Sequence, residues 1–102
     1  MNITHISDQR VHDLVCKTLT PLLPLKKYKI FFFGSRVAGT QASRSDIDIG
    51  ILGRHPVPSA TMHNLREALD ELPILYTMDV VDMATVSATF KKNAMQHVEF
   101  IN

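Results

Sequence analysis

The 102-residue sequence lacks the features that mark several classes of protein. Its single cysteine, Cys16, allows no internal disulfide and fits a reducing compartment. No apolar run approaches membrane-spanning length, and the N-terminus lacks the basic-then-apolar pattern of a signal peptide. Cys16 lies within an apolar helical pattern, which favours a buried structural thiol over a nucleophile. These absences predict a cytoplasmic protein with no membrane association.

Charge excess and clustered metal ligands are also missing. The formal net charge is +1, whereas nucleic-acid-binding proteins usually carry a strong basic excess. The five histidines are scattered without the spacing of a zinc site, and no local signature of a Ser/His/Asp triad is present. A hydrophobic content of 45% with 21% charged residues is typical of a globular protein. We therefore expect one globular domain over residues 1–102.

The hydrophobic periodicity predicts an α/β fold with a small mixed sheet of three or four strands flanked by helices. The first, third and last helices are expected on one side of this sheet, with acidic residues at its open edge. A helix after Ser7 is expected to end near Pro21, and Ser59 and Ser87 are expected to cap two later helices. The predicted elements are, in order, a helix to about residue 22, a strand at 28–33, a short turn-helix after Gly34-Ser35, a strand at 46–52, a helix at 59–72, a strand at 75–83 and a helix at 88–100.

Residues 31–50 give the strongest functional signal. An apolar run ends at Gly34 and Ser35, and a glycine turn after a buried strand is a common place to hold phosphate. Ten residues later, Asp46 and Asp48 alternate with isoleucines, so that the two-residue period of a strand puts both carboxylates on one face. Hard oxygen ligands at this spacing suit Mg²⁺, which completes its shell with water and substrate phosphates.

Further acidic and basic residues are candidates for the same site. Asp79 and Asp82 are three residues apart on a predicted strand and point to opposite faces, so only one of them can join Asp46 and Asp48. The strand pattern alone leaves both open. Arg36, close in sequence to the Gly-Ser turn, is a candidate for binding a triphosphate or an ordinary surface residue. Arg44 is a weaker candidate of the same kind.

Together, these residues resemble the signature of the polymerase-β-like nucleotidyltransferases, and in particular the minimal nucleotidyltransferases of bacteria and archaea. The match is Gly34-Ser35, ten residues, then Asp46-x-Asp48, with a Gly-Ser-Arg-Val-x-Gly stretch typical of the minimal group. It covers more than half of the chain. The resemblance implies a two-metal Mg²⁺ site at Asp46, Asp48 and Asp79, with ATP as the nucleotide. It also implies that Gly34, Ser35 and Arg36 contact the phosphates and leaves Asp82 a capping or salt-bridging role.

The acceptor of the nucleotide is not visible in the sequence. Minimal nucleotidyltransferases of this kind are typically paired with a helical HEPN-type toxin, so the resemblance implies an antitoxin that adenylylates a tyrosine of that toxin. Two other hypotheses stay open: transfer to a small molecule or RNA, and a non-catalytic antitoxin that neutralises its partner by binding. The predicted last helix is apolar on more than one side, which slightly favours contact with a partner and an oligomer that includes it.

The resemblance assigns no role to one cluster of basic residues. Lys26, Lys27 and Lys29 lie around the start of the first predicted strand, at its opposite end from Gly34. They could contact a phosphate or a polynucleotide, but we expect a solvated loop.

Overall fold

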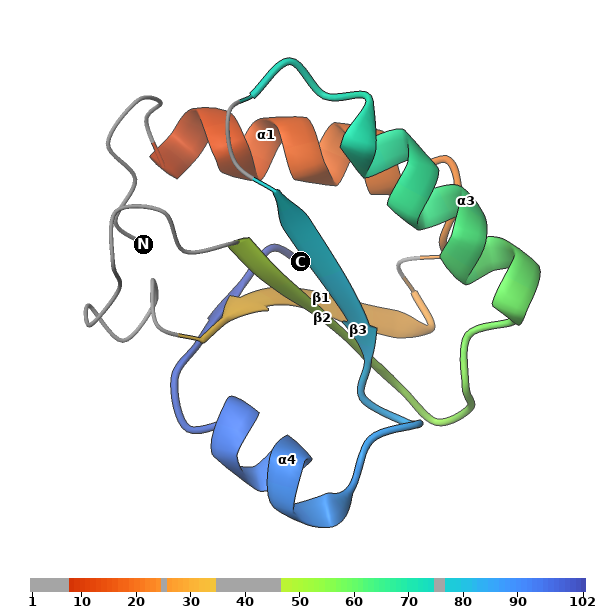
Figure 1. Ribbon diagram of the computed structural model, residues 1–102, viewed down its shortest axis with the longest axis vertical. Helices are drawn as coiled ribbons and strands as arrows, with labels where there is room; N and C mark the ends of the chain where they lie inside the picture. The colour runs from red at the N-terminus through yellow and green to blue at the C-terminus, as the bar shows by residue number, and fades with distance from the viewer. Residues whose placement is uncertain (1–7, 25, 35–46, 75–76) are drawn as a thin grey trace.

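A computed structural model describes residues 8–24, 26–34, 47–74 and 77–102. This part of the chain forms three helices and a four-stranded mixed sheet, which confirms the predicted α/β class (Figure 1). In chain order the elements are α1 (Asp8–Leu19), β1 (Tyr28–Phe33), β2 (Ile47–Gly53), α3 (Ser59–Asp70), β3 (Met78–Asp82), α4 (Ala88–Ala94) and β4 (Val98–Phe100).

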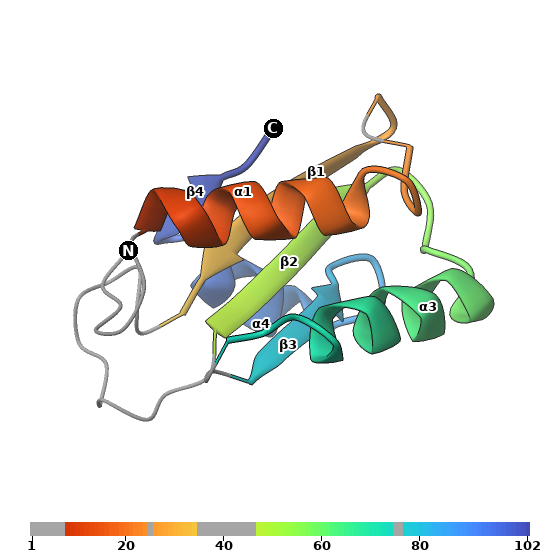
Figure 2. The same cartoon turned by 90° about the horizontal axis from the view of Figure 1, so that it is seen from above.

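The strands lie in the order β3-β2-β1-β4. Strand β1 is antiparallel to both of its neighbours, whereas β2 and β3 are parallel. A parallel pair needs a crossover connection, and α3 supplies it. Figure 2 shows α1 and α3 lying over the same side of the sheet.

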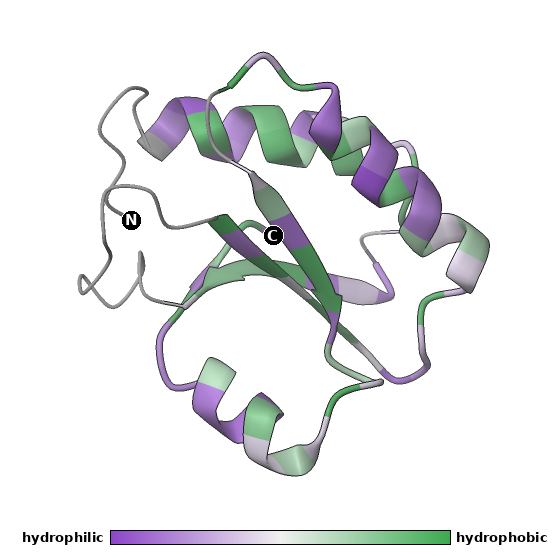
Figure 3. Cartoon of the chain, in the orientation of Figure 1, coloured by the Kyte–Doolittle hydropathy of each residue, from purple (hydrophilic) through white to green (hydrophobic). Residues whose placement is uncertain are grey.

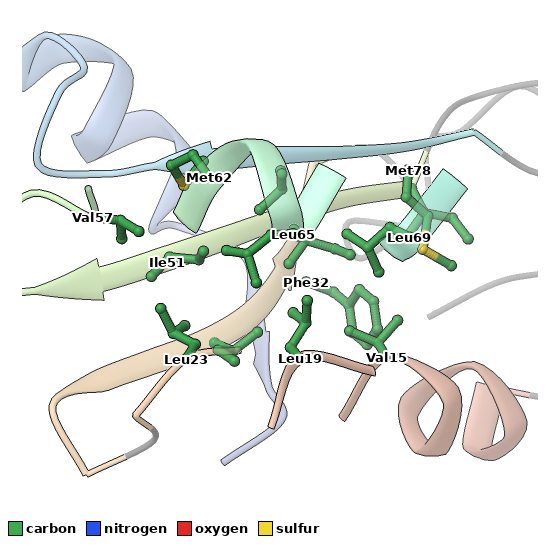
Figure 4. Close-up of a cluster of buried hydrophobic side chains, with 14 of the residues drawn as sticks. Val15, Leu19, Leu23, Phe32, Ile51, Val57, Met62, Leu65, Leu69 and Met78 are labelled. Atoms are coloured by element: carbon green, nitrogen blue, oxygen red, sulfur yellow. The ribbon is translucent and has the colours of Figure 1, made fainter. Parts of the chain in front are cut away.

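The main core lies between the sheet and the helices α1 and α3 (Figure 4). Strand β2 alternates, so that Ile47, Ile49 and Ile51 point into this core while the residues between them point to the other face. Figure 3 shows apolar residues along much of β1 and hydrophilic residues on the outer side of α3. The helices contribute a stripe of fully or nearly fully buried residues: Val11, Val15, Leu19, Met62, Leu65 and Leu69.

The opposite face of the sheet has a smaller core. Phe31, Phe33 and Met83 are buried there, and residues from α4 and its flanks cover them only in part. Helix α4 has no buried residue of its own. Its start follows the sequence prediction, because the Ser87 hydroxyl accepts a hydrogen bond from the Phe90 N–H at 3.1 Å.

Two predictions about the last helix are wrong. The helix ends at Ala94, and Val98–Phe100 form the edge strand β4, which pairs with β1. Helix α4 also lies across the sheet from α1 and α3, not beside them (Figure 1). The physical reason is that β1 offers a second edge, on the side away from β2, and pairing with it satisfies backbone groups of residues 98–100 that a longer helix would satisfy locally.

Smaller differences concern helix ends and one side chain. Ser59 does not cap α3; Pro58 is the N-cap and makes no side-chain hydrogen bond. Cys16 is half-buried on α1, so the expected burial of its thiol is wrong. The third strand is shorter than predicted, at Met78–Asp82, and residues 75–76 lie outside the described residues, as does Ser7. None of the helices in the described segments has the length and apolar character needed to cross a membrane.

Candidate functional site

Gly34 ends strand β1 in a conformation that favours glycine. Its φ is +89°, in the left-handed region where a side chain is strained. A Cβ atom built at this position would overlap the Asp48 carboxylate oxygen Oδ2. The backbone of the turn therefore passes directly against the Asp48 carboxylate.

Asp48 and Asp79 are brought together by the parallel pairing of β2 and β3. They are register partners, so their side chains leave the same face of the sheet on strands about 4.8 Å apart. Asp48 is half-buried and Asp79 is exposed. Two adjacent carboxylates repel one another unless a cation lies between them, and Mg²⁺ takes ligands of this kind. The pair thus has the chemistry of a cation site that opens toward solvent at Asp79.

The carboxylate pair lies on the face that α4 covers. In the strand register, Asp48 lies between Phe33 of β1 and Asp79 of β3. Phe33 is buried, and Phe90 of α4 contacts it edge-on with ring centroids 6.2 Å apart. Phe90 itself is 43% exposed. Sequence reasoning missed this aromatic border, because only the position of α4 shows that Phe90 approaches the strand next to Asp48.

Asp82 has a different environment. Its register partner is Ile51, on the face that carries the main core, and the residue is only 5% exposed. Its carboxylate accepts hydrogen bonds from the Val57 N–H at 2.7 Å and the Ala84 N–H at 3.0 Å. These bonds give Asp82 the capping role expected for it. The arrangement favours Asp79 as the carboxylate that joins Asp48.

Several predicted site residues lie outside the described residues: Ser35, Arg36, Arg44 and Asp46, together with the rest of 35–46. Within the segments that the structure describes, no group of three or more His, Cys, Asp and Glu residues is gathered as a metal site would need. The predicted set of three requires Asp46 in addition to Asp48 and Asp79. That these three carboxylates form a metal site therefore stays a prediction.

Comparison with known proteins supplies the family. The model of the family described as "Polymerase beta, Nucleotidyltransferase" matches residues 25–101. The chain is also 33% identical, over 79 residues, to the probable protein adenylyltransferase MntA of Haemophilus influenzae. That alignment covers 78% of this chain and 68% of the relative.

Solved structures show the same fold. A toxin-antitoxin complex with AMP-PNP contains a chain that is 26% identical, with a TM-score of 0.68 over 89% of this chain and 72% of the other. A complex of tri-AMPylated HEPN toxin from Shewanella oneidensis with MNT antitoxin is similar in fold, with 21% identity and a TM-score of 0.70 over 94% and 72% of the two chains. With its Gly34 turn and paired carboxylates, the chain belongs to the polymerase beta family of nucleotidyltransferases.

Proposed function

We propose that this chain is a Mg²⁺-dependent protein adenylyltransferase that transfers AMP from ATP to a tyrosine of a HEPN-type toxin, and thereby acts as its antitoxin. The observation that carries the proposal is the register pair Asp48 and Asp79, on one face beside the Gly34 turn. Membership of the nucleotidyltransferase family supports the reaction class. The named MntA relative and the AMP-PNP complex support protein adenylylation with an adenine nucleotide.

The described residues fit magnesium. Asp48 and Asp79 offer oxygen ligands side by side, and the exposed Asp79 leaves the pair open to substrate. Asp46 is two residues from Asp48, so the strand period would put it on the same face. When bound, Mg²⁺ would neutralise charge on the triphosphate and favour ionisation of the acceptor hydroxyl. Asp46, Asp48 and Asp79 are the residues that we propose to hold it.

The chain's own residues would position the two reactants. Gly34 lets the backbone of the turn pass close to Asp48, and Ser35 and Arg36 would bind phosphate oxygens through hydroxyl, N–H and guanidinium groups. A tyrosine hydroxyl of the partner would approach from the open side at Asp79. Its oxygen, having given its proton to solvent water, would form a bond to the α-phosphorus as the bond between that phosphorus and the α–β bridging oxygen breaks. Pyrophosphate leaves, and AMP stays on the tyrosine. With its single cysteine, the chain fits this role in the cytoplasm.

Intact-mass measurement of a HEPN-type protein from the same genome, incubated with this chain, ATP and Mg²⁺, tests the proposal. The expected result is a gain of one or more AMP units that is lost in Asp48→Ala. Fragmentation of the modified protein should place AMP on a tyrosine. Asp70→Asn is the matched control, because it removes an exposed carboxylate from α3, away from the site. Transfer by Asp70→Asn should equal that of the parent.

The other outcomes separate the alternative hypotheses. A stable complex with an unmodified partner would contradict catalysis on the toxin and favour neutralisation by contact. AMP incorporated into RNA or a small molecule, with the partner unmodified, would keep the transferase and replace its acceptor.

A further inference from the structure

A basic cavity lies at the end of the sheet opposite Gly34. Its volume is about 510 Å³, and among the described residues it is lined by Lys26, Lys27, Tyr28, Arg54 and His55. The lysines precede β1, whereas Arg54 and His55 follow β2. The two segments meet here because Tyr28 and Gly53 are register partners at the ends of the antiparallel pair.

The cavity is separate from the candidate transfer site. Strand β1 runs from Tyr28 to Phe33, so its two ends are about 17 Å apart at the usual rise per residue. The Asp48 and Asp79 carboxylates lie at the Phe33 end. A single nucleotide is too short to contact both sites through its phosphates.

Positive charge is concentrated at the cavity. Lys26, Lys27 and Arg54 are exposed, and none of the three forms an ion pair with another described residue. No carboxylate appears among the described residues that line the cavity. Without these three cations, the chain has eight Lys and Arg residues against ten Asp and Glu, so its net charge elsewhere is −2.

An aromatic ring forms part of the cavity wall. A Cβ atom at Gly53 would overlap the Tyr28 ring and would lie 3.1 Å from the Lys27 carbonyl oxygen, so the ring lies directly on the Gly53 backbone. Tyr28 is half-buried and also contacts the main core, which limits its freedom. His55 contributes a second ring. The volume is within the range of cavities that hold small ligands, about 300–1,000 Å³.

We propose that this cavity binds a nucleoside phosphate, as a second nucleotide site distinct from the transfer site. Arg54 binds the phosphate oxygens through its planar guanidinium, and the lysines add charge without a metal ion. Tyr28 and His55 provide ring surfaces for the base, since every nucleobase has a face that can stack. A cavity that combines aromatic rings with exposed cations suits a nucleoside phosphate better than an acidic protein segment, because such a segment has no flat base to stack on the rings.

Equilibrium binding of AMP to the full chain without Mg²⁺ tests the proposal, with amide NMR shifts to locate the ligand. We expect saturable binding that shifts Lys27, Gly53 and Arg54 more than Asp79. The variant Lys26→Ala/Lys27→Ala/Arg54→Ala should weaken AMP binding about tenfold or more, because it removes several charge-assisted contacts.

The matched control removes the same charges elsewhere. Its substitutions are Lys17→Ala, Arg66→Ala and Lys92→Ala, all at exposed helical positions. It should bind AMP within about twofold of the parent, because none of the three residues lines the cavity and salt screens exposed charges. Equal weakening in both triple variants would overturn the proposal in favour of general charge attraction. If the cavity variant fails to fold, the single change Arg54→Gln gives the same comparison against Arg66→Gln.

Other probes separate the competing ligands. Inorganic phosphate that binds as tightly as AMP would overturn the nucleoside part, because the rings would then contribute nothing. NMR shifts confined to Gly34, Asp48 and Asp79 would assign all AMP binding to the transfer site. A poly-glutamate peptide that binds more tightly than AMP would assign the cavity to an acidic protein segment instead.

Discussion

The two faces of the sheet are built differently. On one face, α1 and α3 cover a continuous core that includes Phe32, Ile49 and Leu65, each fully buried. On the other, the short helix α4 covers only Phe31, Phe33 and Met83 with side chains that are themselves partly exposed. The first face holds most of the buried apolar residues of the described chain. The second carries Asp48, which is half-buried, and Asp79, which is exposed.

This difference shows how a small chain can keep stability and chemistry apart. Because side chains alternate along a strand, β2 presents isoleucines to the first face and Asp48 to the second. The same alternation on β3 separates Asp79 from Asp82. Changes on the first face should therefore reduce stability, and changes at the acids should reduce transfer.

The largest effect is expected from Asp48→Ala. Transfer to the toxin should fall below detection, because a proposed metal ligand beside the phosphate turn is lost. The melting temperature should change by less than about 8 °C, the shift that corresponds to roughly 1 kcal/mol in a domain of this size. Nucleotide-transfer assays and thermal unfolding of the same preparation measure the two effects. Unfolding with normal transfer per folded molecule would contradict the metal role.

The next largest effect distinguishes the two faces directly. Phe32→Ala should reduce the free energy of unfolding by about 3–5 kcal/mol, because Phe32 is fully buried under α1. Phe90→Ala should cost less than about 1 kcal/mol, since Phe90 is 43% exposed and its ring contacts Phe33 edge-on. Urea unfolding of both variants gives the comparison. Equal losses would show that the α4 face contributes as much stability as the other.

Asp82 and Asp79 lie on opposite faces of β3, so changes at the two residues should have different effects. Asp82→Asn should reduce the free energy of unfolding by about 1–3 kcal/mol, because the Val57 and Ala84 N–H groups lose a charged acceptor. Asp79→Asn should leave stability almost unchanged and reduce transfer. Per folded molecule, Asp82→Asn should transfer more AMP than Asp79→Asn. The reverse order in single-turnover assays would move the third carboxylate to Asp82.

The smallest effect is pH-dependent. Burial alone would raise the pKa of the Glu99 carboxyl, but the hydrogen bond and charge of His12 help to lower it below 4.5. A lowered folded-state pKa stabilises the protein above the unfolded pKa, and this contribution is lost as the pH falls through the folded value. Because Glu99 is one-third exposed, the contribution should be under about 1 kcal/mol. Glu99→Gln should thus lower the urea midpoint at pH 7 and make no difference at the lowest pH where the protein stays folded. A difference in urea midpoint between Glu99→Gln and the parent that stays constant across this pH range would contradict the prediction.

Much of the fold could be predicted from local patterns. The apolar run at 28–33, the alternation after Asp46 and the stripe Met62, Leu65 and Leu69 each agree with the structure within one or two residues. The edge strand Val98–Phe100 could not be predicted, because its hydrogen-bond partner β1 is far away in sequence. The side on which α4 lies also depends on contacts that no local pattern contains.

The candidate site could be predicted only in part, because local patterns do not show which distant strands pair. The two-residue period separates Asp79 from Asp82, but only the register of β2 and β3 shows which one lies beside Asp48. The place of Arg54 and His55 beside Tyr28 could not be predicted, because the sequence cannot show that their loop returns to the start of β1. Long-range pairing decides each of these cases.

The crossover through α3 links the folding of the chain to its activity. Asp48 and Asp79 become neighbours only when β3 docks beside β2, after the intervening helix has closed a long loop. Pairing between distant segments is slow relative to local helix formation. A chain still being synthesised, or one cut before Met78, has the glycine turn and the first acids without their neighbour on β3. Folding and activation would thus be one event, and a damaged or unfinished copy would not modify the toxin.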